Sequence, residues 1–292
     1  MKLRAGILGK EGRLGTALCR DLRTSCDVIP LGRAEIDLSE PAKVAESLKG
    51  LGCDVFINTA AATDVDWCEQ NPEPAWAINA ASPAEIAQWT AQQQIRFIQL
   101  STDYVFNGRH NRPYREEDVT DPLNVYGRTK RCGELDSLAA NPKTLVLRVS
   151  WIFGPDKPSF LEKILNRARN ASRVEAVSNK YSTPTYTRDL ARWLKHLLEK
   201  DSICGVLHVC NSGACSWREW GQVAIDAAKR AGTRFQTDFV NPIPLESLTT
   251  FVADRPRYTA LDTAKFQELT GVRPRPWEEA VQEYVREHYR GA

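Results

Sequence analysis

The stretch ILGKEGRLG, residues 7–15, decides the fold of this 292-residue chain. Its glycines, Gly9, Gly12 and Gly15, follow an apolar run at 3–8 and open a helix-like segment. In such a turn the first glycine allows the tight bend, the second lets a pyrophosphate approach the backbone, and the third lets the helix pack on the sheet. The helix N-terminus favours the anion. The stretch predicts a dinucleotide-binding unit, and the alternative is a glycine-rich turn that only caps a helix.

Short apolar runs alternate with helical patterns beyond this stretch. Strands that alternate with helices indicate βαβ units and a parallel sheet. We expect an α/β fold, with a Rossmann-type doubly wound sheet from residues 1–150 that is completed by elements around 176–210. A smaller, mostly helical substrate lobe should come from 151–175 and 211–292. The expected strands lie at 3–8, 27–32, 54–60, 96–101, 144–150 and 205–210, and the later helices near 74–92, 158–171, 187–199, 216–231, 263–270 and 277–288.

The bulk composition narrows the class of protein. A net charge of +2 and 42% hydrophobic residues give no reason to expect nucleic acid or a membrane as partner. The eight cysteines form no C-x-x-C pair, which is typical of reduced thiols in a cytoplasmic protein. The four histidines have no metal-ligand spacing, so no metal is predicted. No signal peptide or membrane-spanning run is visible, and we expect a cytoplasmic location.

The corner after the second expected strand bears on which dinucleotide binds. NAD sites usually carry an acid there that accepts from the ribose 2′-hydroxyl. This chain has Gly32 and Arg33 instead. An arginine suits a 2′-phosphate, because its guanidinium makes charge-assisted pairs with phosphate oxygens. Arg33 therefore favours NADPH over NADH, although a solvated arginine near Glu35 and Asp37 is the alternative.

Three residues form a candidate catalytic set. Thr102 ends the fourth expected strand, and the stretch NVYGRTKRCGE, residues 124–134, carries Tyr126 and Lys130 four apart on one helix face. An ammonium a few Å from a phenol lowers a pKa of about 10 by roughly one to three units. The phenol then serves as an acid near neutral pH. A threonine, a tyrosine and a lysine in this order predict a site that reduces a carbonyl group.

Longer stretches resemble a known family. They include GKEGRLG, INTAAATDVDWCE, LSTDYVFNG, DPLNVYGRTKRCGE, LRVSWIFG, NKYSTPTYTRDLA and RPRYTALDTAKF, between residues 9 and 266. In this order they resemble the extended short-chain dehydrogenase/reductases, and most closely the dTDP-4-dehydrorhamnose reductases. Sugar-nucleotide dehydratases of that superfamily carry a glutamate where this chain has Tyr104. The chain departs from the family pattern at Ala62 and Asn107, near the expected sugar site.

The resemblance implies NADPH-dependent reduction of the C4 keto group of dTDP-4-dehydro-6-deoxy-L-mannose to dTDP-L-rhamnose, with NADH as an alternative cofactor. Another 4-keto-6-deoxy sugar nucleotide stays open as substrate, and so does a non-catalytic NADP-binding role like that of the methionine adenosyltransferase β subunit. A homodimer is also open. The implied catalytic residues are Thr102, Tyr126 and Lys130. The implied cofactor residues are Gly9, Gly12, Arg13, Leu14, Arg33, Asp37, Leu38, Ala60 and Ala61, with Tyr126 and Lys130. The implied substrate residues are Val65, Thr102, Asp103, Tyr104, Trp151 and Arg255.

Overall fold

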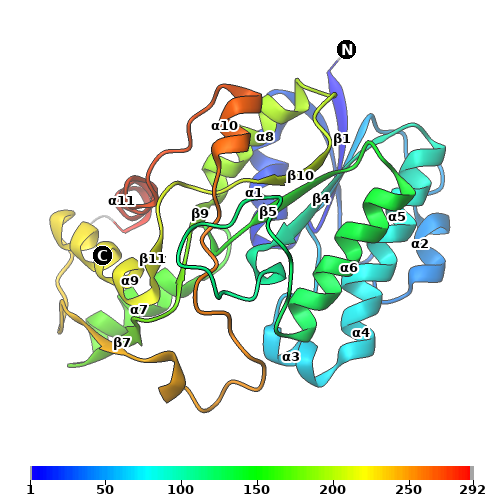
Figure 1. Ribbon diagram of the computed structural model, residues 1–292. Coiled ribbons are helices and arrows are strands. Elements are labelled where there is room, and N and C mark those ends of the chain that lie inside the picture. The colour runs from blue at the N-terminus through cyan, green and yellow to red at the C-terminus, as the bar shows by residue number, and fades with distance from the viewer. Residues whose placement is uncertain (1, 290–292) are drawn as a thin grey trace.

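A parallel sheet of six strands organises the molecule, whose computed structural model describes residues 2–289 (Figure 1). The strand order is β10-β5-β4-β3-β1-β2, and every neighbouring pair is parallel. Successive strands are added on one side of β1 and then, from β3 on, on its other side. This change in strand order makes a crevice at the carboxyl ends of β1 and β3. The strands are β1 (Leu3–Leu8), β2 (Cys26–Leu31), β3 (Val55–Asn58), β4 (Arg96–Thr102), β5 (Leu145–Val149) and β10 (Gly205–His208).

Helices cover both faces of the sheet, so the predicted doubly wound Rossmann-type fold is confirmed. One face packs on α1 (Arg13–Asp21), α8 (Thr187–Leu198) and α10 (Ala264–Thr270) through buried side chains that include Leu18 and Leu194. The other face packs on α2 (Pro41–Ser47) and α5 (Ser82–Gln92), and α6 (Val125–Ala140) lies beside α5. Both faces of a parallel sheet need such cover because its strands are apolar throughout.

A second core lies beside the sheet and belongs to a smaller, mostly helical lobe, as predicted. It is built from α7 (Phe160–Asn170), α9 (Trp217–Arg230) and α11 (Trp277–His288), with β7 (Val174–Val177) pairing β12 (Val240–Ile243). The domain boundaries themselves stay a prediction. Shorter elements connect the two parts: β6 (Ile152–Phe153) pairs β9 (Thr185–Tyr186), β8 (Tyr181–Ser182) pairs β11 (Cys215–Ser216), and 3₁₀ turns lie at Leu22–Thr24, Asp103–Val105 and Leu245–Ser247.

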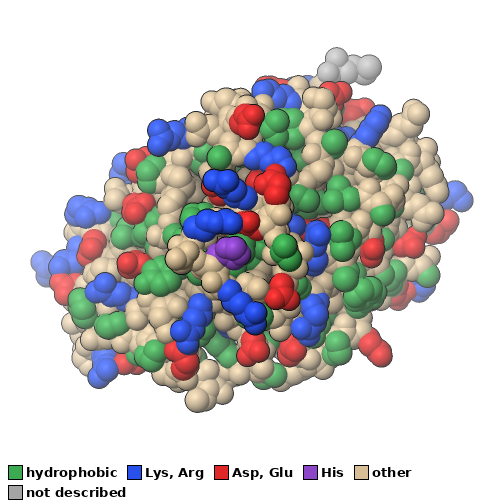
Figure 2. Space-filling view, viewed as in Figure 1, with side chains coloured by type: hydrophobic (Ala, Val, Ile, Leu, Met, Phe, Trp, Pro, Cys, Tyr) green, Lys and Arg blue, Asp and Glu red, His purple; other side chains and the backbone are tan. Residues whose placement is uncertain are grey.

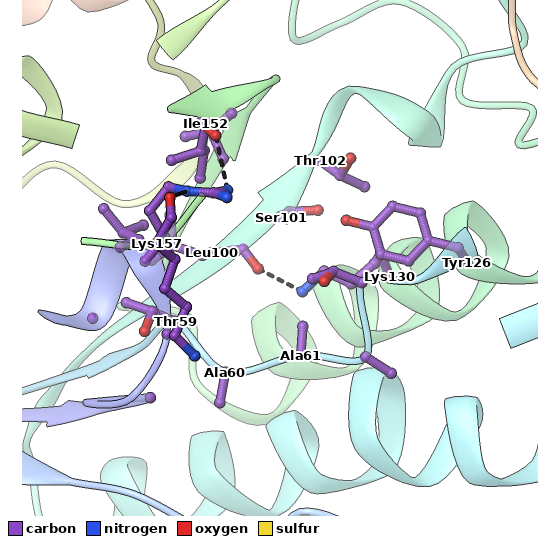
Figure 3. A pocket seen from close by; sticks show the side chains of 18 of the residues that line it. Thr59, Ala60, Ala61, Leu100, Ser101, Thr102, Tyr126, Lys130, Ile152 and Lys157 are labelled. Carbon is purple, nitrogen blue, oxygen red and sulfur yellow. Dashed lines mark hydrogen bonds between the residues drawn. The ribbon is translucent and has the colours of Figure 1, made fainter. Parts of the chain in front are cut away.

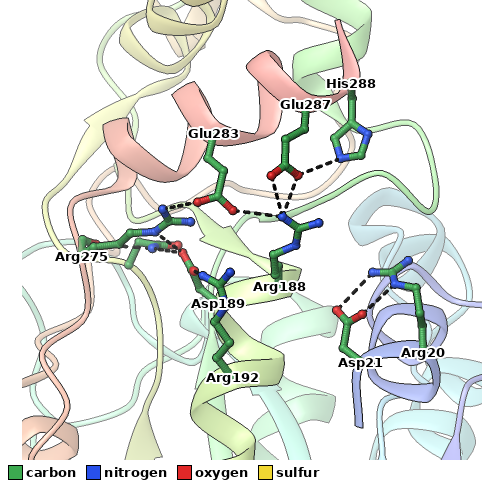
Figure 4. Close-up of polar contacts among 10 residues, drawn as sticks. Arg20, Asp21, Arg188, Asp189, Arg192, Arg275, Glu283, Glu287 and His288 are labelled. Atoms are coloured by element: carbon green, nitrogen blue, oxygen red, sulfur yellow. Dashed lines mark hydrogen bonds and ion pairs between the residues drawn. The ribbon is translucent and has the colours of Figure 1, made fainter. Parts of the chain in front are cut away.

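Ion pairs join the helical lobe to the sheet side at α8 and α11 (Figure 4). Arg188 at the start of α8 contacts Glu283 and Glu287 on α11. Asp189, buried beside it, accepts from Arg275 at 2.8 Å. Because Asp189 is only 3% exposed, its pairing is screened less by water than a surface pair would be. These ion pairs fix how the helical lobe packs against the sheet.

The predicted helix at 74–92 is interrupted. The structure has α3 (Val65–Gln70), α4 (Pro72–Trp76), a π-helical turn at Ala77–Ala81, and then α5. Pro83 lies in the first turn of α5 and has no N–H to donate, so the hydrogen-bond ladder is broken there. Single π-helical turns within α-helices often accompany functional sites.

The outer surface carries charges of both signs. On the face shown in Figure 2, lysine and arginine side chains are interspersed with aspartate and glutamate. All eight cysteines are free thiols, and five of them are buried. Within residues 2–289 no helix is long and apolar enough to cross a membrane, and no cluster of three metal-ligand side chains occurs. The homodimer and the cytoplasmic location stay predictions.

Candidate active site

A cleft of about 820 Å³ opens where β1, β3, β4 and β5 end (Figure 3). Its walls are residues at or just after those ends, such as Gly9, Ala60, Thr102 and Trp151. Open α/β sheets bind ligands along this edge. Nearly the whole predicted site set lines the cleft: Gly9, Gly12, Arg13, Leu14, Arg33, Asp37, Leu38, Ala60, Ala61, Val65, Thr102, Asp103, Tyr104, Tyr126, Lys130 and Trp151, but not Arg255.

The glycine loop at one end of the cleft is closely packed. Gly9 has φ +101°, and a Cβ there would lie 2.4 Å from Thr59 Oγ1. A Cβ on Gly15 would lie only 1.9 Å from the carbonyl oxygen of Gly9. Helix α1 begins after Gly12 with no side-chain cap and no acid in its first turn. The exposed N–H groups of that turn therefore suit an anion such as a pyrophosphate.

The corner after β2 carries one cation toward the cleft. Arg33 lines the cleft with its side chain 80% exposed, and its Nε donates to Asp37 at 3.1 Å. Glu35 points elsewhere, to Lys10 at 2.7 Å and to the N–H of Gly32. Among the described residues the guanidinium is paired with Asp37, and Glu11 also lines the cleft beside Gly32. The exposed guanidinium fits a phosphate at this corner.

The Arg13 side chain makes contacts that the sequence did not predict. Its guanidinium donates to the carbonyl oxygens of Ile152, Lys157 and Pro158, far along the chain. It therefore joins the glycine loop to the loop that follows β6. Arg13 also lines the cleft, and its predicted contact with a cofactor stays a prediction.

The predicted catalytic residues meet at the end of β4. The Tyr126 hydroxyl lies near Thr102, whose own hydroxyl donates to Asp103 at 3.2 Å. Lys130, one helical turn after Tyr126, is buried and donates to the carbonyl oxygen of Leu100 at 2.7 Å. Figure 3 shows the tyrosine hydroxyl directed toward the end of the strand. The arrangement places a phenol, a hydroxyl and an ammonium around one point of the cleft.

The pKa of Tyr126 is shifted in the direction opposite to the one predicted. Burial raises the pKa of Tyr126 above its ordinary value, and the neighbouring Thr102 hydroxyl opposes this only in part. Lys130 Nζ is directed to a backbone oxygen, and burial lowers its own pKa to about 8. Tyr126 is thus a protonated phenol at neutral pH, which is the form that a proton donor needs.

A buried carboxylate holds the catalytic helix against the sheet. Glu134, one turn after Lys130, accepts from Ser101 on β4 at 2.5 Å and from Arg148 on β5 at 2.8 and 2.9 Å. Arg148 is 1% exposed and Glu134 is 0% exposed. A bidentate pair of this kind is geometrically specific, so it fixes the register of α6 on β4 and β5. The position of Lys130 follows from that register.

The far end of the cleft is walled by aromatic rings. Trp151 has φ +39°, a strained value for a residue with a side chain, and its ring stacks on Trp220 with centroids 5.4 Å apart. The ring of Tyr104 meets that of Tyr126 edge-on at 5.7 Å. Trp151 was expected to be either a sugar platform or a packing residue. It lines the cleft and packs on a neighbouring ring at the same time.

Comparison with known proteins places this site in a family. The model of the RmlD substrate binding domain matches residues 4–290. The chain belongs to that family.

Relatives agree over nearly their whole length. The chain is 33% identical to the dTDP-4-dehydrorhamnose reductase of Salmonella typhimurium over 291 residues, 97% of each protein. It is equally 33% identical to the spore coat polysaccharide biosynthesis protein SpsK of Bacillus subtilis over 285 residues, 96% of each. The solved dTDP-4-dehydrorhamnose reductase of Bacillus anthracis, in complex with NADP, superposes with a TM-score of 0.90 at 27% identity, covering 98% of this chain and 100% of that one.

Arg255 lies outside the cleft in this RmlD-family chain. Its guanidinium pairs with Asp66 at 2.9 Å and lies over the ring of Phe251. Asp66 also accepts from the N–H groups of Val252 and Ala253. The predicted contact of Arg255 with the substrate stays a prediction. In this structure the arginine holds residues 251–259, which we call the strap, against the start of α3.

Several residues of the RmlD-family cleft were missed by sequence reasoning. Lys157 and Lys163 line it, and neither ammonium has an ion pair within residues 2–289. Phe160, Trp217 and Trp220 add to the aromatic wall beside Trp151. The strings SFLEK and SWREW contain these residues, but nothing in either string indicates that tertiary packing brings it to the sheet edge.

Proposed function

We propose that this protein uses NADPH to reduce the C4 keto group of dTDP-4-dehydro-6-deoxy-L-mannose, giving dTDP-L-rhamnose. The observation that carries the proposal is the meeting of Tyr126, Thr102 and Lys130 in the cleft, beside a glycine loop. The similarity to dTDP-4-dehydrorhamnose reductases, one of them solved with NADP, supports both substrate and cofactor.

The residues of the cleft fit a dinucleotide phosphate. Gly9 and Gly15 leave no room for a Cβ, so the backbone at the start of α1 is bare. Gly12, Leu14, Leu38, Ala60 and Ala61 complete this end. Arg33 offers a cation for a 2′-phosphate, which favours NADPH, and NADH is the weaker alternative. When bound, the nicotinamide supplies a hydride for C4 of the sugar.

Tyr126 acts as the proton donor in the proposed reaction. It transfers its hydroxyl proton to the C4 oxygen while that carbon gains a hydride, so the ketone becomes a secondary alcohol. Thr102 lies beside the phenol, and its hydroxyl is oriented by Asp103, to which it donates. The ammonium of Lys130 stabilises the negative charge that is left on the tyrosine oxygen, and a pKa of about 8 keeps it mostly charged at neutral pH.

The substrate would extend from this point toward the aromatic wall. Val65, Tyr104 and Trp151 surround the sugar, whose C–H face packs well on a large ring. We assign the diphosphate to Lys157 and Lys163. The other cations of the cleft are engaged within the protein: Arg13 by carbonyl groups, Arg33 by Asp37 and Lys130 by Leu100.

A second candidate is a reductase for a different nucleotide-linked sugar. The identity to SpsK equals that to the Salmonella reductase, so similarity alone does not choose between them. The departures at Ala62 and Asn107 bear on the same choice. Ala62 lines the cleft, whereas the Asn107 side chain is bound to Tyr114 and Asp121. A non-catalytic NADP-binding role is disfavoured by the intact catalytic set.

The deciding experiment is turnover with purified protein, NADPH and dTDP-4-dehydro-6-deoxy-L-mannose. We expect loss of NADPH absorbance and a product heavier by two hydrogens. Tyr126→Phe is the matched inactive control. Turnover only with another 4-keto-6-deoxy sugar nucleotide would select the second candidate. NADPH binding without turnover on any such sugar would leave the non-catalytic role.

A further inference from the structure

Lys180 is a fully buried lysine outside the cleft that the proposed reaction does not use. Its exposed fraction is 0%, and within residues 2–289 it has no ion pair. Its Nζ has one hydrogen-bond acceptor, the carbonyl oxygen of Pro256 at 2.6 Å. A buried ammonium with so few partners costs much free energy, and such groups are concentrated at functional sites.

The ammonium lies behind two aromatic rings that form the wall of the cleft at its proposed sugar end. Nζ lies 4.9 Å from the centre of the Tyr104 ring and 6.0 Å from that of Trp151. Both rings line the cleft, and Tyr104 in turn contacts Tyr126. A cation within about 6 Å of a ring face is attracted to it, most strongly when water is excluded. Lys180 therefore lies close to two side chains of the cleft wall, although it does not line the cleft itself.

The acceptor Pro256 belongs to the strap, residues 251–259. The strap is held at other points by Asp66, which binds Val252 and Ala253, and by Asn124, which donates to Asp254 at 2.7 Å. Beside it, Tyr181 receives the N–H of Thr259 at 2.9 Å. The ammonium of Lys180 thus lies against the strap, the turn after β4 and Trp151, the second residue after β5.

We propose that Lys180 is a positioning residue for the sugar end of the cleft: its ammonium holds the rings of Tyr104 and Trp151 against the strap, so that the wall is formed before substrate binds. The sugar identity and the role of the wall rest on the proposed function. The contact between the cation and the two rings does not.

The charged neighbours of Lys180 act in opposite directions. Asp103, on the 3₁₀ turn with Tyr104, favours the ammonium, whereas Arg255 on the strap disfavours it. Burial outweighs both and lowers the pKa of Lys180 to about 8. The pKa of Tyr104 is raised by burial, so that phenol stays neutral. The ammonium is therefore present below about pH 8 and is lost as the pH rises above it, and the attraction to the rings is lost with it.

The first experiment needs no sugar nucleotide. Protein labelled with 5-fluorotryptophan is titrated from about pH 7 to about pH 9, across the Lys180 pKa, and its ¹⁹F spectrum is followed. The Trp151 resonance is assigned with Trp151→Phe. We expect it to shift with a midpoint near the lysine pKa in the wild type, and to stay fixed in Lys180→Met. A wild-type resonance that does not move, or one that moves equally in Lys180→Met, would overturn the contact. If Lys180→Met does not fold, the wild-type titration and Lys180→Arg, which stays charged, decide the matter.

The second experiment measures binding of dTDP-L-rhamnose by calorimetry with NADP⁺ present. Lys180→Met should weaken binding about ten-fold or more, and its affinity should not change between about pH 7 and about pH 9. The wild type should weaken as pH rises. Affinity for NADPH should stay within about two-fold in both proteins, a change of only roughly 0.4 kcal/mol. Lys143→Met, an exposed lysine at the opposite end of β5, is the matched control.

The two experiments separate the proposals. If the wild type does not bind dTDP-L-rhamnose, the proposed function fails and the fluorine titration still tests Lys180. If the wild type binds it and folded Lys180→Met binds it equally well at every pH, the positioning role fails while the proposed function stands. A loss of affinity with the same pH dependence as the wild type would make Lys180 a packing residue only.

Discussion

The two ends of the cleft are built in different ways. The proposed cofactor end is made of backbone from one short stretch, residues 9–15, where the essential feature is the absence of side chains. The proposed sugar end is made of side chains from distant segments, such as Tyr104 and Trp151, with Lys180 and Arg255 packed outside the cleft. The first depends on local conformation, and the second depends on the whole tertiary fold.

The difference teaches how each end can be damaged. An anion site of backbone N–H groups fails when a carbon atom is added where two backbone segments touch. A wall of rings fails when a charge or ring behind it is removed, even where the altered residue never meets the ligand. The catalytic residues lie between the two ends, so altering their chemistry should spare binding at both.

The largest effect is expected where the ends meet. Tyr126→Phe removes the proton donor and keeps the ring that packs on Tyr104. General acid catalysis is worth about 10²–10⁴-fold, so kcat should fall by that factor, with NADPH affinity unchanged. Steady-state kinetics and fluorescence titration measure the two. Tyr258→Phe, a partly exposed tyrosine outside the cleft, is the control. A kcat above half the wild-type value would remove Tyr126 from the chemistry.

Adding one methyl group should break the cofactor end alone. In Gly15→Ala the new carbon meets the Gly9 carbonyl oxygen at 1.9 Å, so the loop must move. Overpacking costs about 1–3 kcal/mol, and NADPH affinity should fall by about ten- to a hundred-fold. Gly271→Ala is a fair comparison, since its φ of +76° is strained but no atom lies within 4 Å of the added carbon. Equal NADPH affinity in both variants would show that the loop tolerates displacement.

Arg33→Ala sharpens the comparison, because Arg33 contributes a side chain to the end of the cleft that is otherwise made of backbone. A hydrogen bond to a charged group is worth about 1.5–3 kcal/mol. Since Arg33 is largely exposed and shares its charge with Asp37, we expect the low end, about a ten-fold loss of NADPH affinity. NADH should be nearly unaffected, and the difference should shrink in high salt. Equal losses for both cofactors would make Arg33 structural, and a wild-type preference for NADH would mean that the corner was misread.

The smallest effects are expected at the diphosphate. Lys157→Met and Lys163→Met each remove one exposed cation, worth about 0.2–1 kcal/mol. Each should raise KM for the sugar nucleotide about two- to five-fold, less at high salt. Binding of thymidine, which lacks phosphate, should not change. Arg255→Met tests the predicted substrate contact of that arginine: a larger and equally salt-sensitive loss there, with the strap intact, would make Arg255 the diphosphate ligand.

The sequence predicted the strand, the glycine loop and the first helix well because their signals are local. Glycine spacing, a preceding apolar strand and a following helix all lie within about fifteen residues, and the order of strands and helices follows from periodicity. Tyr126 and Lys130 were readable for the same reason, since one helical turn separates them. The pKa direction of Tyr126 was not, because burial outweighs the neighbouring charge and burial is a tertiary property.

The sugar end was predicted only where a family motif named its residues. Lys180 stands inside the quoted stretch NKYSTPTYTRDLA, yet nothing local indicates that its ammonium lies behind Tyr104 and Trp151. Arg255 was assigned to the ligand because an arginine beside a proline in a loop looks available. Its partner Asp66 is 189 residues away in the chain, and no sequence pattern links the two.

The hydrogen bonds of the Arg13 side chain can form only late in the synthesis of the protein. Its most distant acceptor, the carbonyl group of Pro158, lies 145 residues later in the chain. At about 5–20 residues per second, a ribosome adds that length in about 7–29 seconds. The glycine loop is therefore among the first parts to be synthesised, but the Arg13 side chain has no protein acceptor until the loop after β6 has been synthesised. A nascent chain should acquire its mature glycine loop only after the residues up to Pro158 have been made.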